Sequence, residues 1–318
     1  MQPNLYVLCI INAQAGSNYS IEYSFAGEEI TVKLKRSLAY AGIGFITLII
    51  VSLILKWPFK ITQKYHSPKL NTQKTADITL NTVQVPRKDE DTKNNGKIYK
   101  FPDGGIPVLM YHSIRTTPGN SLCVPVKQFS EEMEWLHLQN YQTLSIDELY
   151  DALTEKTLTA KKPIVLTFDD GYTDNYNSAW PILRQYGFRA NFFIITDAVG
   201  SGAMNWSELA ELVKNGNSIG SHTVRHLDLT KLTPKQQEKE ITISKQELEK
   251  HLGIHVRALC FPSGRYNNET LKLMPKSGYE LGFTTQPGKV HLGDNLLLLK
   301  RVRISGGMPF SNFQKIFP

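Results

Sequence analysis

Short apolar runs alternate with amphipathic stretches from residue 106 to the end of the chain. The apolar runs predict strands, over residues 106–112, 163–168, 190–196, 218–222, 257–262, 279–285 and 296–304. Apolar positions with the helical period predict helices between them, over 127–139, 146–155, 174–186, 206–214, 234–251 and 268–277. Ser145 and Thr233 stand at N-cap positions, and Gly187, Gly216 and Gly253 follow helix ends.

This alternation predicts a parallel sheet with helices outside it. Six or seven strand–helix units in about 215 residues suit a closed barrel better than an open sheet. We therefore expect an α/β fold over 104–318, a distorted (β/α) barrel of about seven strands.

A single long apolar run precedes this domain. From Ser37 to Leu55 the chain has 19 residues without charge, close to the roughly 20 that a membrane-spanning helix needs. A cleaved signal peptide and a buried helix are the alternatives, but the run is long for a signal peptide and no clear cleavage site follows it. We expect a transmembrane anchor over 37–57, between a short N-terminal segment (1–36) and a flexible stalk (58–103).

Residues 1–31 are polar and show no assignable period, and the stretch VKLKRSLAY after them resembles an ordinary bacterial start. Our hypothesis is that translation begins near Val32, so that the first stretch is absent from the native protein. Detection of a peptide from residues 1–31 by mass spectrometry would contradict it.

The net charge of +7 over 318 residues is unevenly distributed. Residues 56–100 contain ten basic and four acidic side chains, whereas residues 101–318 contain 23 basic and 22 acidic ones. The excess therefore lies in the stalk, which argues for a tether near a membrane and against a nucleic-acid groove. Of three cysteines, Cys9, Cys123 and Cys260, the last two either pair outside the cell or remain buried thiols.

Polar residues gather where three predicted strands end. His112 follows the first strand, Asp169 and Asp170 follow the second, and His222 and His226 follow the fourth. Because the carboxyl ends of parallel barrel strands face one mouth, where catalytic groups collect, we expect these side chains to lie together.

The i, i+4 spacing of His222 and His226 would place both imidazoles on one face of a helical turn, within reach of one metal ion. Such pairs also occur without metal, and an Asp-Asp-Gly turn can simply cap a helix. A carboxylate from Asp169 or Asp170 completes a set of two histidines and one carboxylate, which leaves a coordination position open. The other carboxylate would then accept a proton.

The segments TFDDG (167–171) and SHTVRH (221–226) resemble the first two motifs of polysaccharide deacetylases, the carbohydrate esterase family 4 or NodB-homology enzymes. The resemblance spans roughly residues 105–305 and implies that Asp169 is the catalytic base. It implies that a divalent metal is held by Asp170, His222 and His226. Zinc is the usual metal, and cobalt, nickel or iron suits the same donors.

A third motif is partly kept. The segment FPSGRYN (261–267) resembles the family's Pro-aromatic-Gly turn, whose backbone N–H helps form the oxyanion hole, with Ser263 in place of the aromatic residue after Pro262. The family's arginine two residues before this proline is replaced by Cys260. That replacement leaves the orientation and the pKa of Asp169 open.

The family's C-terminal Leu-x-x-His motif is missing, because no histidine follows His291. Residues 110–112 (MYH) instead resemble the subgroup with circularly permuted motifs, which includes deacetylases of biofilm poly-β-1,6-N-acetylglucosamine. In that subgroup the histidine of the first strand is the general acid; a buried core histidine is the alternative for His112. Tyr111, Trp206 and Tyr266 are candidates for stacking on sugar rings, against rim packing.

The function implied is metal-dependent hydrolysis of the acetamide of N-acetylglucosamine units in an extracellular or cell-wall polysaccharide. Non-haem iron oxygenases use the same donor set, but typically on all-β folds. A glycosidase needs separated acids and leaves the histidines unexplained. The non-enzymatic alternative is a catalytically impaired glycan-binding module anchored to the membrane, without chelation-sensitive turnover. A surface glycan would require the domain to lie outside the cytoplasmic membrane, which protease treatment of intact cells tests.

Overall fold

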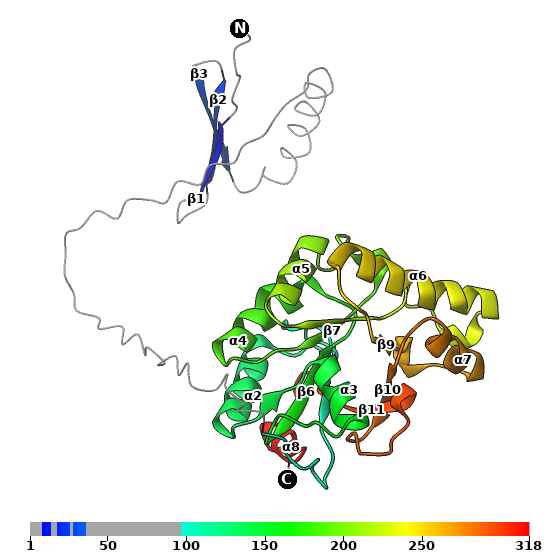
Figure 1. Ribbon diagram of the computed structural model, residues 1–318. Helices are drawn as coiled ribbons and strands as arrows, with labels where there is room; N and C mark the ends of the chain where they lie inside the picture. Colours follow the sequence, from blue (N-terminus) through cyan, green and yellow to red (C-terminus); the bar gives the residue numbers. More distant parts are fainter. Residues whose placement is uncertain (1–7, 14–17, 26–27, 36–96, 318) are drawn as a thin grey trace. The chain divides into compact units, whose positions relative to one another are not determined.

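The computed structural model describes residues 8–13, 18–25, 28–35 and 97–317, and the chain divides into two compact units, 1–85 and 86–318 (Figure 1). The predicted membrane segment over 37–57 and most of the stalk lie outside the described residues. Among the residues described, no helix is both long and apolar enough to cross a membrane.

The N-terminal unit contains an antiparallel three-stranded sheet, formed by β1 (Leu8–Ala13), β2 (Asn18–Phe25) and β3 (Glu28–Lys35). This corrects our interpretation of residues 1–31 as a stretch without a period. The β2 sequence NYSIEYSF alternates polar residues with aromatic or aliphatic ones, which is the period-two pattern of a strand.

The second unit is a closed parallel barrel. Its strands are β4 (Val108–Tyr111), β6 (Pro163–Phe168), β7 (Asn191–Ile194), β8 (Ser218–Ser221), β9 (Ala258–Cys260), β10 (Leu281–Pro287) and β11 (Leu299–Arg303). They follow the order β4-β11-β10-β9-β8-β7-β6, and pairing of β4 with β6 closes the ring. The seven predicted strands and the barrel are therefore confirmed. A two-residue strand, β5 (Gln142–Thr143), pairs with the start of β6 and is too short to predict from periodicity.

Helices surround this barrel (Figure 1). They are α2 (Val126–Leu138), α3 (Ile146–Thr154), α4 (Trp180–Gln185), α5 (Trp206–Lys214), α6 (Pro234–Leu252), α7 (Asn268–Lys276) and α8 (Phe310–Gln314). The helix predicted over 174–186 begins as a π-helical turn, η1 (Asn175–Ala179), before α4. The predicted caps form: Ser145 and Glu148 make a reciprocal capping box at α3, and Thr233 N–H donates to Gln236 at α6.

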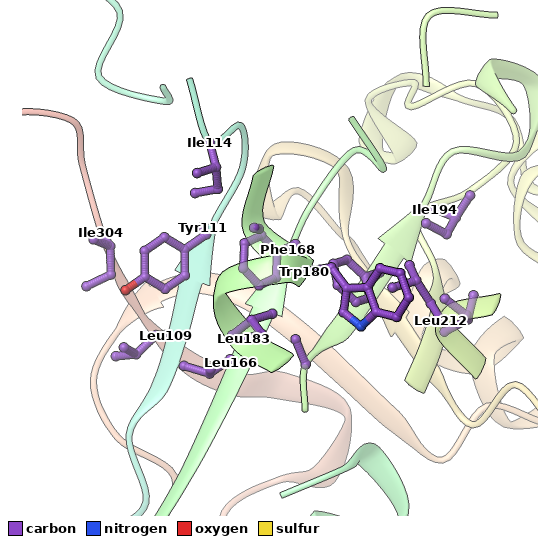
Figure 2. Close-up of a cluster of buried hydrophobic side chains, with 14 of the residues drawn as sticks. Leu109, Tyr111, Ile114, Leu166, Phe168, Trp180, Leu183, Ile194, Leu212 and Ile304 are labelled. Atoms are coloured by element: carbon purple, nitrogen blue, oxygen red, sulfur yellow. The ribbon is translucent and has the colours of Figure 1, made fainter. Parts of the chain in front are cut away.

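Strand alternation separates two groups of buried side chains. The outward strand face packs against the helices, and its buried side chains form what we call the outer cluster. This cluster includes Leu109, Leu166 and Phe168 of the strands, Leu183 of α4 and Leu212 of α5 (Figure 2). Alternate strand positions form a second cluster on the opposite, inner face, with Val108, Val165, Phe193, Cys260, Phe283 and Leu299. A polar residue at a strand end therefore faces the barrel interior only if it occupies the same alternate positions along the strand as the inner cluster.

Candidate active site

Asp169 lies on the inner side of the barrel wall because of this alternation. Leu166 and Phe168 of β6 belong to the outer cluster, so Thr167 and Asp169 point the other way. Asp169 is 2% exposed. A carboxylate at this depth requires a partner, since burial of an unpaired charge is costly.

The partner is Arg301 of β11, which the sequence analysis missed. Its Nη1 donates to Asp169 Oδ1 and its Nη2 to Oδ2, both at 2.7 Å, and its side chain is fully buried. Nη1 also donates to Thr167 Oγ1 at 3.1 Å, and Nε donates to the carbonyl of Thr284 at 3.0 Å. The available signal in the sequence was that Arg301 lies two residues after the apolar Leu299, so it points to the same inner face of β11.

This ion pair determines the protonation of Asp169. Burial raises the pKa of Asp169, but the charge and the hydrogen bonds of Arg301 outweigh burial and hold the pKa well below its usual range. Asp169 is therefore ionised at physiological pH, as a proton acceptor has to be before it acts.

Arg301 also explains how Asp169 is held although Cys260 replaces the family's arginine. The thiol accepts a hydrogen bond from Arg301 Nη2 at 3.0 Å and lies 3.6 Å from Asp169 Oδ2. The short side chain at position 260 leaves room for a guanidinium that enters from β11. Cys123 and Cys260 are both free and buried, so the disulfide alternative does not form in this structure.

Asp170, His222 and His226 form a cluster of possible metal ligands. One donor atom from each lies within 4.8 Å of the others. Asp170 Oδ1 is 3.4 Å from His222 Nε2 and 3.6 Å from His226 Nε2. Asp170 has a φ of 71°, and this sharp turn at the strand end brings its carboxylate to a different position from that of Asp169.

The two histidines do not converge on a helical turn, which corrects the prediction made from their i, i+4 spacing. Residues 222–226 form an irregular loop, in which Thr223 and His226 have φ values of 67° and 57°. The loop is fixed by Ser221 Oγ, which accepts from Thr223 N–H, and by Thr223 Oγ1, which accepts from His226 N–H. Left-handed backbone at residues other than glycine costs about 1–3 kcal/mol each and often marks functional sites.

The donor set fits a divalent metal. His222 Nδ1 lies 2.8 Å from the carbonyl oxygen of Cys260. Because a carbonyl oxygen only accepts, Nδ1 carries a proton, which leaves Nε2, 3.4 Å from Asp170 Oδ1, as the nitrogen that can bind a metal, as in metal-ligating histidines. Asp169, His222 and Cys260 are equally close together, but both oxygens of Asp169 already bind Arg301, so the Asp170 cluster is the better site.

His112 lies beside Asp169. Its Nε2 is 4.0 Å from Asp169 Oδ2, and its side chain is 11% exposed. Burial lowers the pKa of His112, and the nearby carboxylates offset this only in part. The imidazole is therefore neither on the surface nor packed in the apolar core; it faces the Asp169 carboxylate across a short gap.

Two further residues hold the end of β4 in place and were also missed. Asn175 Nδ2 donates to the carbonyl of His112 at 2.7 Å. The Asp174 carboxylate accepts from Ser113 Oγ at 2.6 Å and from Ile114 N–H at 2.8 Å. Asp174 and Asn175 lie at the start of the helical segment that follows the Asp-Asp-Gly turn, so one stretch of chain carries the aspartates and positions the end of β4.

Residues 262–264 of the third motif form a short 3-10 turn. Ser263 is exposed with a φ of 52°, and Pro262 before it is buried. The N–H groups of Gly264 and Arg265 donate to backbone carbonyls, whereas Ser263 N–H has no acceptor among the described residues. Tyr266 packs against Phe261 with ring centroids 4.9 Å apart and is half-buried.

One aromatic candidate for sugar stacking is corrected by the structure. Tyr111 is fully buried in the outer cluster, stacked on Phe168 (Figure 2), because it occupies an outward-facing position of β4. Trp206 is half-buried, and one face of its ring stacks on His251 at a centroid distance of 4.2 Å.

Tyr111 is hydrogen-bonded to a buried carboxyl group, that of Glu132. Its hydroxyl donates to Glu132 Oε2 at 2.8 Å, and Gln128 Nε2 donates to Oε1 at 2.9 Å. Glu132 is 1% exposed. Burial raises its pKa to about 7, although the two hydrogen bonds act in the opposite direction.

Glu132→Gln is expected to remove a pH-dependent loss of stability. Because the pKa of Glu132 is higher in the folded than in the unfolded state, its contribution to the free energy of unfolding is complete below about pH 4.5. This contribution is lost as the pH rises through about 7. The glutamine amide oxygen can still accept from Gln128 Nε2, and its NH2 group can donate to the Tyr111 hydroxyl oxygen. The advantage of the variant in unfolding free energy should therefore grow by up to about 3 kcal/mol from pH 5 to pH 8. Urea unfolding across this range measures it, with exposed Glu131→Gln as the control. Parallel curves for wild type and Glu132→Gln would contradict the prediction.

A pocket of about 420 Å³ opens beside the donor cluster. Asp170, Tyr172 and His226 line it, together with residues of the 195–203 loop. The donor cluster, Asp169 and His112 therefore meet at the carboxyl ends of β4, β6 and β8, next to a space that can take a ligand.

Comparison with known proteins decides the family. Residues 156–282 match the model of the polysaccharide deacetylase family. YxkH of Bacillus subtilis, which carries the name of a polysaccharide deacetylase, is 42% identical over 232 residues, covering 73% of this chain and 82% of that protein. The chain belongs to the polysaccharide deacetylase family.

Other members of the family are more distant in sequence but share the fold. The Streptococcus pyogenes deacetylase PplD, solved with acetate, aligns with a TM-score of 0.64 at 35% identity over 67% of this chain and 99% of that one. IcaB from Ammonifex degensii aligns with a TM-score of 0.59 at 24% identity, over 69% and 98% of the two chains. The poly-β-1,6-N-acetyl-D-glucosamine N-deacetylase of Staphylococcus epidermidis is 24% identical over 257 residues, 72% of this chain and 89% of that protein.

Proposed function

We propose that this polysaccharide deacetylase removes the acetyl group from N-acetylglucosamine units of an extracellular or cell-wall polysaccharide and releases acetate. The observation that carries the proposal is the position of Asp169, held by Arg301, between His112 and the Asp170–His222–His226 cluster. Family membership supports deacetylation, as does the acetate in the structure of PplD. The name of the S. epidermidis relative supports N-acetylglucosamine as the sugar.

We assign Asp170, His222 and His226 as ligands of a divalent metal, zinc being the first candidate. Such an ion would polarise the acetamide carbonyl and make the attacking water more acidic. Asp170 and the two Nε2 atoms supply the donors, and the Cys260 carbonyl keeps His222 in the ligating tautomer. The extracellular setting rests on the polymeric substrate, and the stalk and membrane anchor predicted from the sequence would give the domain that setting.

The side chains divide the proton transfers between them. Asp169 takes the proton of the attacking water at Oδ2, while Arg301 keeps its carboxylate in place. The 4.0 Å gap between Asp169 Oδ2 and His112 Nε2 allows this proton to pass to the neutral imidazole. His112 Nε2 then gives it to the amine nitrogen as the carbon–nitrogen bond breaks, and acid–base help of this kind is typically worth about 10²–10⁴-fold. Acetate and a free amine are the products.

The oxyanion that forms during the attack needs a donor besides the metal. Ser263 N–H is the candidate, because the following two N–H groups are used within the turn. One such donor contributes roughly 3–4 kcal/mol in other hydrolases. The substitution of the family's aromatic residue by serine leaves this backbone group in place.

The purified full chain is expected to release acetate from N-acetylglucosamine oligomers, with Asp169→Asn as the inactive control. Acetate release by wild type and none by the variant would support the proposal. Binding of the same oligomers without any acetate release, in a protein loaded with zinc, would favour the glycan-binding alternative.

A further inference from the structure

Arg303 stands at the mouth of the barrel on the same strand face as Arg301. Side chains two residues apart on a strand point the same way, about 6–7 Å further along it. Val302 and Ile304, the alternate positions, pack into the outer cluster. Arg301 faces Asp169, so Arg303 rises above this pair toward solvent, where it is exposed.

The Arg303 guanidinium makes no hydrogen bond and no ion pair with any residue in the part of the chain that the structure describes. Two other arginines near the site do have partners: Arg115 lies 3.8 Å from Asp174, and Arg265 lies 3.6 Å from Asp228. The Asp169 carboxylate inside the barrel is already bound through both oxygens by Arg301.

The backbone around Arg303 is held firmly. Arg303 pairs with Met110 of β4, two residues before His112, and Ile304 N–H donates to the Met110 carbonyl at 3.1 Å. Gln128 accepts from Gly307 N–H at 2.9 Å and donates to the Ser305 carbonyl at 3.0 Å. Gly306 is packed so closely that a Cβ there would lie 2.0 Å from the Cys123 carbonyl oxygen. A fixed backbone that carries a free guanidinium beside the catalytic groups is preorganised for a ligand.

We propose that Arg303 binds an anionic group, a carboxylate or a phosphate, on the glycan next to the N-acetylglucosamine that is deacetylated. A guanidinium suits either group because its parallel N–H bonds match two oxygens. The ligand pocket lined by Asp170 and Tyr172 lies on the β6–β8 side of the site, whereas Arg303 lies on the β11–β4 side. A glycan that crosses the mouth would therefore place the target sugar at the donor cluster and a neighbouring substituent at Arg303. This inference rests on the proposed function and specifies its substrate class.

The test compares three oligosaccharides of equal length: neutral, carboxylate-bearing and phosphate-bearing N-acetylglucosamine oligomers. For the wild-type chain, kcat/KM should be at least about tenfold higher for one anionic oligomer than for the neutral one. Arg303→Gln should bring this ratio toward one, mainly through KM. Lys300→Gln removes the same charge from an exposed position of β11 and should leave the ratio unchanged. The anionic oligomer with the higher ratio identifies the group.

Dissociation constants separate this inference from the proposed function. They are measured with Asp169→Asn and with the double variant Asp169→Asn/Arg303→Gln. Asp169→Asn should bind one anionic oligomer more tightly than the neutral one, and the double variant should lose this preference, even if no oligomer is turned over. Equal wild-type kcat/KM for all three oligomers, or an Arg303→Gln effect that is the same on each, would overturn the inference. A shifted pH–rate profile with an unchanged ratio would also overturn it, because Arg303 would then act through His112.

Discussion

Arg301→Met is expected to lower the free energy of unfolding by about 3–5 kcal/mol and to reduce acetate release by at least about 10²-fold. The variant leaves the Asp169 carboxylate buried without its cation, and breaking a buried pair costs about this much. Without Arg301 the burial that raises the pKa of Asp169 is no longer opposed, so the base becomes protonated and poorly oriented. Urea unfolding and acetate release measure the two effects separately.

The double variant Arg301→Met/Asp169→Asn distinguishes the ion pair from simple packing. Removing both charges should recover most of the lost stability, because no buried charge remains, while activity stays absent. The stability that the pair gives should be present above about pH 4 and lost on acidification, since the folded pKa of Asp169 is depressed. If the single variant unfolds within about 1 kcal/mol of wild type, Arg301 does not have this role.

His222→Ala and His226→Ala are each expected to bind little metal and to lose at least about 10³-fold in acetate release. Each removes one of three donors, and the remaining two hold a divalent ion weakly. Metal content of the purified full chain, measured after reconstitution with zinc or cobalt, is the first readout. Chelation of the wild type should abolish activity, and zinc should restore it.

His255→Ala is the matched control for these variants. His255 is exposed, its side chain is 58% accessible, and it pairs with Glu249 and Glu280 away from the donor cluster. Its removal should change neither metal content nor activity. A wild-type chain that binds no zinc or cobalt after reconstitution, or histidine variants that bind as much as wild type, would exclude the metal site.

The elements of the barrel follow from local sequence. The period of apolar positions predicts all seven barrel strands and most helices, because burial of one face is a property that neighbouring residues share. The caps at Ser145 and Thr233 follow from side chains that bond backbone groups three residues away. Asp169, Asp170, His112, His222 and His226 could be placed at one mouth, because a parallel barrel collects the ends of its strands there.

The tertiary structure decided which side chains meet within that mouth. Arg301 reaches Asp169 from 132 residues away in the chain, so no local spacing reveals that β11 supplies the arginine that position 260 lacks. The histidines meet through a loop with two left-handed residues rather than through a helical turn. Besides its local side-chain bonds, the loop backbone accepts from the N–H groups of Thr196 and Asp197, which follow the neighbouring strand β7. Tyr111 and His112 are adjacent in sequence, yet one is buried outside the barrel wall and the other faces the base. Local periodicity encodes which faces are buried, whereas contacts between distant strands depend on how the ring closes.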